Sequence, residues 1–488
     1  MVAMMKKRGW SLVHQKEVAP NKLANEEIAS MAHLMRRAGF GDPRRDLDVR
    51  VSQGYEEVVE ELLHPEDQPA INDELLYRIF PGYEGALGPP INQAEWVYRM
   101  INTKRPLEEK MALFWHQLFA TSNSKVDNPP EITRQIAMFR RFGLGKYRDL
   151  LMELAKSPAM IFWLDNHGNH DGATNENWGR ELLELFSLGV GNYTEDDIQE
   201  AARAFTGWTI APKIPRNPLG RFYWEFEYKP EDHDEREKTF LGHTGNLNGE
   251  DIVDIIVEQP ATARFLARHL YRFFVADEPP VPNWNITPPN DPDAIDALVA
   301  AYNDSGGDIT SILRVLFNAD FFKGSRFAKV KSPAELIIGT VRISGGYYGF
   351  RPGLNNLALE CGWQGQELLN PPSVESWHTG QSWLDVGTLL RRVNFAARTL
   401  GDTSLPGVRT IIEGIREQGN LSPGEVVAAC LDAVGPLEVG EETHAELMVN
   451  AEKNGRLAWS TPGEVNASEK TLGKILTLIA ASKDYQFA

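Results

Sequence analysis

The chain has 488 residues, of which 42% are hydrophobic and 24% are charged, an ordinary composition for a globular protein with a large core. Its formal net charge of -18 repels phosphate backbones and anionic lipid head groups, so the charge argues against nucleic-acid partners and against binding at membrane surfaces. The sequence has no apolar run of about 18 residues, so we expect no transmembrane helix.

The N-terminus and the two cysteines give information about the cellular location of the protein. Residues 1–22 are expected to be a loose arm, in which the polar stretch His14 to Glu17 follows the basic residues too soon for a secretory signal peptide. This pattern favours a cytoplasmic location. Cys361 and Cys430 lie in separate segments without a CxxC neighbour, which excludes a disulfide framework and a zinc finger. Both thiols are expected to be buried.

Helical periodicity dominates the first part of the chain. Apolar residues at i, i+3 and i+4 spacing predict helices in the segments 25–37, 55–63, 106–120, 130–142 and 147–164. A polar loop at 165–176 leads into an acidic helix at 176–188. Thr194, with Asp197 three residues later, predicts a capped helix that ends at Gly207.

The clearest β pattern lies at 222–228, where every second residue is a large aromatic, as in a half-buried strand. The segment 238–241 is a candidate partner for this strand. We therefore expect a mainly α fold, a large helical array with a small β-hairpin insertion at 208–245.

Helices are predicted again at 251–257, 262–274, 293–302 and 308–317, and Ser332-Pro333-Ala334-Glu335 has the residues of a helix start. The proline-rich run 279–292 is expected to be a linker or a stiff surface loop. It would separate a helical domain at 23–278, which carries the candidate site, from a C-terminal helical region at 293–488. That region could belong to the same domain.

The acidic helix places one carboxylate in an unusual position. Glu176, Arg180 and Glu184 share a polar face, where Arg180 could pair with either glutamate. Glu181 instead projects into the apolar arc of the helix. Because burial of an unpaired charge is costly, this carboxylate needs a partner or a raised pKa. Two interpretations stay open: a structural ion pair or backbone hydrogen bond, and a general acid/base or metal ligand that faces a cleft.

The loop before this helix is rich in metal-ligand types. Asp165, Asn169 and Glu176 match positions 1, 5 and 12 of an EF-hand loop, which indicates calcium. His167 and His170 depart from that pattern, because imidazole is a poor calcium ligand and the second histidine stands where the loop needs glycine. With a carboxylate, these histidines would suit a transition metal. A third interpretation is that the polar residues only cap the next helix.

Further residues could take part in a site. His116 lies at the edge of the apolar face of its helix, as a core residue or a group that orients a substrate. His233 stands between two aspartates, where it could shuttle protons or belong to a solvated turn. Trp377 and Trp383 lie near glycines in expected loops, where aromatic faces could stack on sugars.

The residues support two classes of function. The first is a metal-assisted or carboxylate-driven hydrolase of a polar polymer or glycan. In it Glu181 acts as base, Arg180 and His116 orient the substrate, and the 165–176 loop holds a divalent cation. The second is a non-enzymatic scaffold, or a protein- or carbohydrate-binding protein, with a structural polar loop. Phosphate-binding loops, dinucleotide fingerprints and nucleophile elbows are absent from the sequence, so nucleotide-dependent and serine-hydrolase classes lack support.

Several stretches, in order along the chain, resemble a bacterial family, the domain-of-unknown-function family eighteen hundred. They are His33-Leu-Met-Arg-Arg-Ala-Gly-Phe-Gly41, Phe114-Trp-His-Gln-Leu-Phe119, 175–191, Glu200-Ala-Ala-Arg-Ala-Phe-Thr-Gly-Trp208, 233–242, 260–264 and Pro371-Pro-Ser-Val-Glu-Ser-Trp377 with 389–394. The resemblance implies a mostly helical fold and a bacterial source, but no activity. Family members are often exported and encoded near a sulfatase-like protein, which implies export as the alternative location and such a protein as a candidate partner. Ser376 stands where the resemblance implies a glycine.

Overall fold

The structure, a computed structural model, describes residues 22–79, 89–213, 223–279, 287–453 and 455–488. The predicted mainly α class is confirmed, since helices make up most of the described chain and the strands form only two small antiparallel hairpins. The expected arm at 1–22 lies outside the described residues except for Lys22, which begins the first helix. Most of the proline-rich run, 280–286, lies outside them as well.

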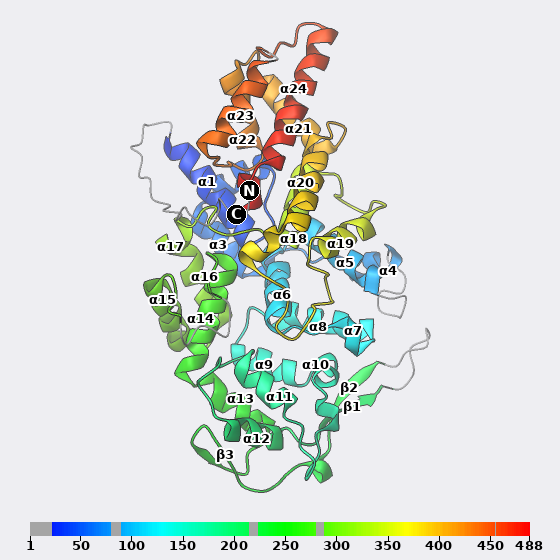
Figure 1. The fold of residues 1–488 in the computed structure, drawn as a ribbon, viewed down its shortest axis with the longest axis vertical. Helices are drawn as coiled ribbons and strands as arrows, with labels where there is room; N and C mark the ends of the chain where they lie inside the picture. The colour runs from blue at the N-terminus through cyan, green and yellow to red at the C-terminus, as the bar shows by residue number, and fades with distance from the viewer. Residues whose placement is uncertain (1–21, 80–88, 214–222, 280–286, 454) are drawn as a thin grey trace.

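The molecule is elongated, and its helices form three tiers along the long axis (Figure 1). The middle tier begins with α1 (Lys22–Arg37), α2 (Arg44–Gln53), α3 (Tyr55–Leu63), α4 (Asp73–Ile79), α5 (Pro89–Asn102) and α6 (Pro106–Leu118). At the lower edge of this tier lie α7 (Asn123–Val126) and α8 (Pro129–Phe142) (Figure 1). The chain then forms the lower tier with α9 (Tyr147–Ala155), α10 (Pro158–Trp163), α11 (Asn177–Glu184), α12 (Glu195–Ala204) and α13 (Gly249–Val257).

The second half of the chain returns through the middle tier to the upper one (Figure 1). It runs through α14 (Pro260–Phe274), α15 (Pro292–Ser305), α16 (Ile309–Asn318), α17 (Asp320–Lys323), α18 (Pro333–Ser344), α19 (Leu354–Trp363) and α20 (Val386–Gly401). The upper tier holds α21 (Pro406–Glu417), α22 (Pro423–Ala433), α23 (Glu441–Glu452) and α24 (Pro462–Ala481).

The β insertion is real, but its predicted pairing is wrong. β2 (Trp224–Tyr228) pairs with β1 (Trp208–Pro212), whereas β3 (Lys238–Phe240) pairs with β4 (His243–Gly245). The strand pattern identified β2 but contained no information about its partner, because pairing depends on contacts outside the strand itself.

The sequence predicts the starts of the helices more reliably than their lengths. The capping boxes at Thr194 and at Ser332 are both present. The single helix predicted at 147–164 is two, because Pro158 cannot donate the backbone hydrogen bond that a continuous helix needs and begins α10 instead. The acidic helix is also shorter than predicted and ends at Glu184.

Two large hydrophobic clusters hold the tiers together. The first joins buried residues from Met31 to Phe395 and so includes helices from both sides of the proline-rich run. The second lies among α18 and α20–α24. Cys361 and Cys430 are buried free thiols, as predicted. In the part of the chain that the structure describes, no helix combines the length and the apolar character needed to cross a membrane.

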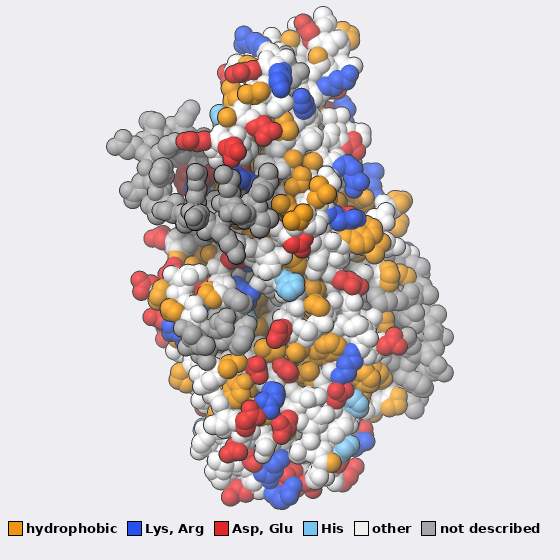
Figure 2. Space-filling view, in the orientation of Figure 1, with side chains coloured by type: hydrophobic (Ala, Val, Ile, Leu, Met, Phe, Trp, Pro, Cys, Tyr) orange, Lys and Arg blue, Asp and Glu red, His pale blue; other side chains and the backbone are white. Residues whose placement is uncertain are grey.

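Charged side chains of both signs cover the lower tier, whereas hydrophobic side chains gather over α19 and α20 (Figure 2). The exposed apolar side chains there include Trp363, Val386 and Leu390.

Candidate functional site

A groove of about 870 Å³ lies where the lower and middle tiers meet. Its walls come from α6, the end of α11, the end of α14, the loop residues 277–279 and 329–332, and the segment 372–383, in which a 3-10 helix begins at Gly380. The polar residues that line it are Gln117, Glu184, His269, Arg272, Asp277, Glu278, Asn290, Lys329, Ser332, Glu335, Ser373, Glu375, Ser376, His378, Thr379, Gln381 and Ser382. Its volume is near the upper end of the range for small-molecule sites.

Helix α11 brings carboxylates to this groove because of how it packs. Trp178, Leu182 and Leu183 are buried in the main core. A Cβ atom at Gly179 would lie 3.0 Å from the Ile198 carbonyl oxygen of α12, so the glycine permits a close helix crossing. These contacts fix the rotation of α11 and leave Glu181 on the opposite side.

Two carboxylates of the groove, Glu184 and Glu375, act electrostatically on Glu181, which lies beside the groove, and the three are called here the three-carboxylate cluster. Glu184 and Glu375 line the groove, and Glu181 lies one turn before Glu184. Burial raises the pKa of Glu181 to about 7, with further contributions from the negative charges of Glu184 and Glu375. Glu181 forms no ion pair with a described residue, which removes the structural ion pair as its explanation.

The neighbours of Glu181 on α11 are engaged elsewhere. Arg180 pairs with Glu176 at 3.3 Å and with Glu195 at 2.8 Å, not with Glu184. Glu184 instead accepts a hydrogen bond of 3.3 Å from the Tyr193 hydroxyl. The negative charge of Glu184 therefore remains beside Glu181, and Arg180 only partly offsets it.

The segment 372–383 forms a wall of the groove that contains a strained residue. Ser376 has a φ of 76°, in the left-handed region that favours glycine, and its buried hydroxyl has no hydrogen-bond partner among the described residues. The glycine that the family resemblance implies would adopt this φ without strain. The next residue, Trp377, packs with Trp383 and Val330.

His116 lies under this wall rather than in the open groove. Its ring is fully buried between Trp96, with ring centroids 5.7 Å apart, and Trp377, with centroids 5.3 Å apart. Burial lowers its pKa to about 3, so the ring is neutral at neutral pH. Neither ring nitrogen forms a hydrogen bond with a described residue. Its contact with Trp377 places that indole, which is the role that the geometry supports.

Most other charges of the groove are paired. Lys329 contacts Asp277 at 3.1 Å, Arg268 contacts Glu278 at 3.1 Å, and Arg37 contacts Glu335 at 2.8 Å. Lys110 also pairs with Glu335, and burial lowers the pKa of that lysine to about 8. Each of these acids therefore has a cation within contact distance, and Glu335 has two.

In the loop predicted to bind a metal, each side chain contacts a different partner. Asp165 pairs with Lys125 at 2.7 Å, and Glu176 pairs with Arg180. Asn169 is buried, and its amide donates to the Ala202 carbonyl at 2.8 Å while its oxygen accepts from the backbone of Asn175. The asparagine thus holds the loop against α12 and caps the turn into α11.

The two histidines of the loop each contact a side chain outside the loop. His167 stacks on Phe162 with centroids 5.1 Å apart, and His170 contacts Asp232. Over the described ranges, no group of three or more His, Cys, Asp or Glu side chains is arranged to hold a metal ion. The structure therefore assigns these residues contacts that fasten the loop, and the cation site remains a prediction from sequence.

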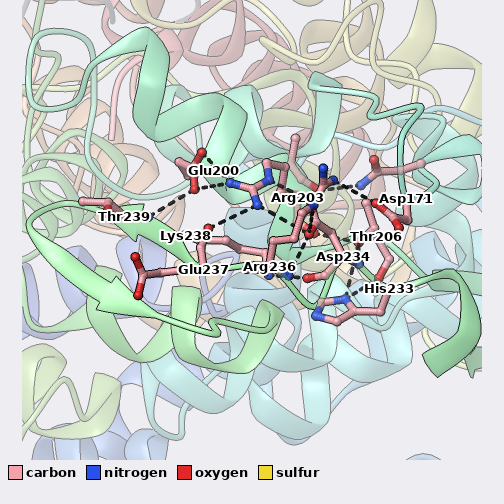
Figure 3. Close-up of polar contacts among 12 residues, drawn as sticks. Asp171, Glu200, Arg203, Thr206, His233, Asp234, Arg236, Glu237, Lys238 and Thr239 are labelled. Atoms are coloured by element: carbon pink, nitrogen blue, oxygen red, sulfur yellow. Dashed lines mark hydrogen bonds and ion pairs between the residues drawn. The ribbon is translucent and has the colours of Figure 1, made fainter.

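His233 belongs to a network that fastens the β3–β4 hairpin to α12 (Figure 3). The imidazole lies 2.9 Å from the Thr206 carbonyl. Next to it, the fully buried carboxylate of Asp234 accepts hydrogen bonds from Arg203 and Arg236. These contacts overcome the cost of burial and lower the pKa of Asp234. None of these residues lines the groove, and His233 is not among the charges that act on Glu181.

Among the residues that line the groove, the sequence indicated Trp377 and Trp383 but not Glu375 and Arg272. A signal for Glu375 was present, since it lies inside the Pro371–Trp377 motif that carries the family resemblance. No local pattern marked Arg272, which lies on the amphipathic helix α14 among other basic residues.

The profile of a family described as protein of unknown function (DUF1800) matches residues 33–487. The chain belongs to the DUF1800 family. The match covers all three tiers and every residue of the groove. It assigns no activity to them. No curated protein and no solved structure matches the chain significantly.

Proposed function

We propose that this DUF1800 protein is a carboxylate-driven hydrolase that cleaves a polar polymer, a glycan, in the groove beside α11. The observation that supports this best is the cluster of Glu181, Glu184 and Glu375, in which the pKa of Glu181 rises to about 7. A carboxyl group with that pKa is partly protonated at neutral pH and so suits proton transfer.

In the proposed reaction Glu181 donates its proton to the leaving oxygen as the glycosidic C–O bond breaks. Glu375, an exposed carboxylate of the groove, accepts a proton from the attacking water, whose oxygen forms the new bond to carbon. One protonated and one ionised carboxyl group are the pair that hydrolysis of a glycosidic bond requires. The negative charge of Glu184 helps to keep the proton on Glu181.

The assignment differs in two ways from the expectation based on sequence. Glu181 acts as acid in the cleavage step rather than as base, because its pKa is the raised one. The reaction uses carboxylates alone, so it includes neither the cation predicted at 165–176 nor a substrate contact from Arg180, whose guanidinium is paired with Glu176 and Glu195.

The groove also supports a saccharide ligand through its aromatic wall. Trp377 and Trp383 line the groove, but only 5% and 4% of their surfaces are exposed, so a small part of each indole can meet sugar C–H groups. The same observation would support a carbohydrate-binding protein without activity, the second candidate function. Cleavage separates the two, because a binding protein leaves its ligand intact.

The test is release of reducing ends from a panel of neutral, amino-sugar and uronic-acid polysaccharides by the full chain. We expect cleavage of at least one class, and a fall of at least about 100-fold in Glu181→Gln and in Glu375→Gln, since a positioned acid or base contributes roughly that factor or more. Glu413→Gln is the matched control, because Glu413 is an exposed residue of α21 outside the groove.

Two results would contradict the proposal. One is a panel in which the wild-type protein cleaves nothing. The other is a Glu181→Gln variant that cleaves as fast as the Glu413→Gln control.

A further inference from the structure

Arg272 differs from the other cations of the groove. It lies near the end of α14, it lines the groove, and its guanidinium is half-buried. Lys329 contacts an acid of the groove directly. Arg272, by contrast, forms no ion pair of 4.0 Å or less with any described residue, and its guanidinium donates a hydrogen bond to the Thr379 hydroxyl.

Burial without an ion pair is unfavourable for a guanidinium, which has five N–H donors in a rigid plane. Desolvation accordingly lowers the pKa of Arg272, although Asp277 and Glu278 oppose this effect at longer range. Both acids are already paired, with Lys329 and Arg268 respectively. Most donors of Arg272 therefore remain for a group that enters the groove.

The charges around Arg272 differ from those around the three-carboxylate cluster. The charges that act on Arg272 are Asp277 and Glu278, and the charges that act on Glu181 are Glu184, Arg180 and Glu375. A ligand that fills the groove would thus meet both negative carboxylates and an unpaired guanidinium.

We propose that Arg272 and Thr379 form a subsite for a carboxylate of the substrate, so that the saccharide of this groove carries uronic-acid-type rings. The inference rests on the proposed function in one respect, since it names the substrate class of the same groove. The planar guanidinium matches the two oxygens of a carboxylate in a bidentate pair, and the hydroxyl of Thr379 fixes its plane.

The position of Thr379 is itself determined by the wall. Gly380 follows it with a φ of 60°, and a Cβ atom at Gly380 would lie 3.0 Å from the Asp277 carboxyl carbon. The glycine lets the segment turn tightly against Asp277 and carry Thr379 to Arg272. The subsite is thus built from a helix end and a fixed turn.

The test compares the affinity of the protein for an oligogalacturonate tetramer and for the same tetramer after reduction of its carboxyl groups to alcohols. Calorimetry is performed on Glu181→Gln, so that cleavage does not deplete the ligand, and on the wild-type protein. We expect the acidic tetramer to bind about 10–100-fold more tightly, since a charged hydrogen-bonded pair contributes at that level. Arg272→Gln should remove this preference, and Thr379→Ala should weaken it.

Arg264→Gln is the matched control, because Arg264 lies on the same helix, pairs with Asp296 at 3.0 Å and does not line the groove. Arg272→Lys retains the charge without the planar fork and should recover only part of the preference. A folded Arg272→Lys protein keeps the test decisive if Arg272→Gln is unstable.

The proposal is overturned if the two tetramers bind equally, if the acidic tetramer does not bind, or if Arg272→Gln keeps the preference. Binding of a sulfated tetramer in place of the uronate would also overturn it. If Arg272 governs a preference for the carboxylate and no variant or wild-type protein cleaves any ligand, the subsite is supported and the hydrolase proposal fails.

Discussion

Replacement of Glu181 by glutamine should make the protein more stable at high pH than the wild type. The pKa of Glu181 is about 7 in the folded protein against a usual value of 4.5. Between these values the folded state holds more protons than the unfolded state, so the contribution of Glu181 to stability falls as the pH rises from about 4.5 to about 7. Above pH 7 Glu181 is ionised in both states, and the free energy of unfolding is lowered by the full cost of burying the ionised carboxylate.

The size of this cost follows from the pKa difference. In a fully shielded site it would be roughly 3 kcal/mol. Because Glu181 is only half-buried, solvent screening reduces it to about 1–2 kcal/mol. For a chain of this length, that corresponds to about 1–2 °C in Tm.

The assay is thermal unfolding of wild type, Glu181→Gln and Glu413→Gln at intervals from pH 5 to pH 8. The Tm of Glu181→Gln should rise relative to the wild type across that interval, whereas the Tm difference for Glu413→Gln should stay constant. A Glu181→Gln protein that is less stable than the wild type at pH 8 would refute the reasoning, because it would show a stabilising partner for the carboxylate.

Two further predictions concern the charges around Glu181 and the network around Asp234. Glu184→Gln should lower the pH midpoint of the Glu181 effect by roughly 0.5–2 pH units, the range for a like charge at about 6 Å, one helical turn away, between a watery and a protein-like dielectric. Glu375→Gln should lower the midpoint by less, and an unchanged midpoint in both variants would separate Glu181 from its neighbours. Asp234→Asn should destabilise the protein by about 1–3 kcal/mol in chemical unfolding, because it weakens the charged hydrogen bonds that a buried carboxylate accepts from two arginines. Asp171→Asn, which removes an exposed ion pair, should cost clearly less, about 0.5 kcal/mol or below. Equal losses in the two variants would contradict the structural role of the network.

Much of the fold could be predicted because helices are specified locally. The box of Thr194 and Asp197 and the sequence from Ser332 to Glu335 each contain their own capping partners within one turn, and both form as predicted. The pairing of β2 with β1 could not be predicted, since the strands are separated by a connection that periodicity does not describe.

The candidate site shows the same limit. Helical periodicity placed Glu181 in an apolar arc, and the structure finds it half-buried with a raised pKa. Its neighbour Glu375 comes from a segment almost two hundred residues later, so no spacing rule joins them. For the 165–176 loop the reverse holds: the sequence pattern suggested a site, but the fold gives its residues other contacts. Its ligand-like spacing was visible in the sequence, but the contacts of Asn169 and His170 depend on Ala202 and Asp232, which only the fold brings near.

The most direct test of the proposed acid is the pH dependence of kcat/KM on the glycan that the protein cleaves. Glu181 must be protonated to donate, so the rate should fall as the pH rises through about 7, and Glu181→Gln should have no such limb. A rate that keeps rising above pH 8, or an alkaline limb that survives in Glu181→Gln, would contradict the account.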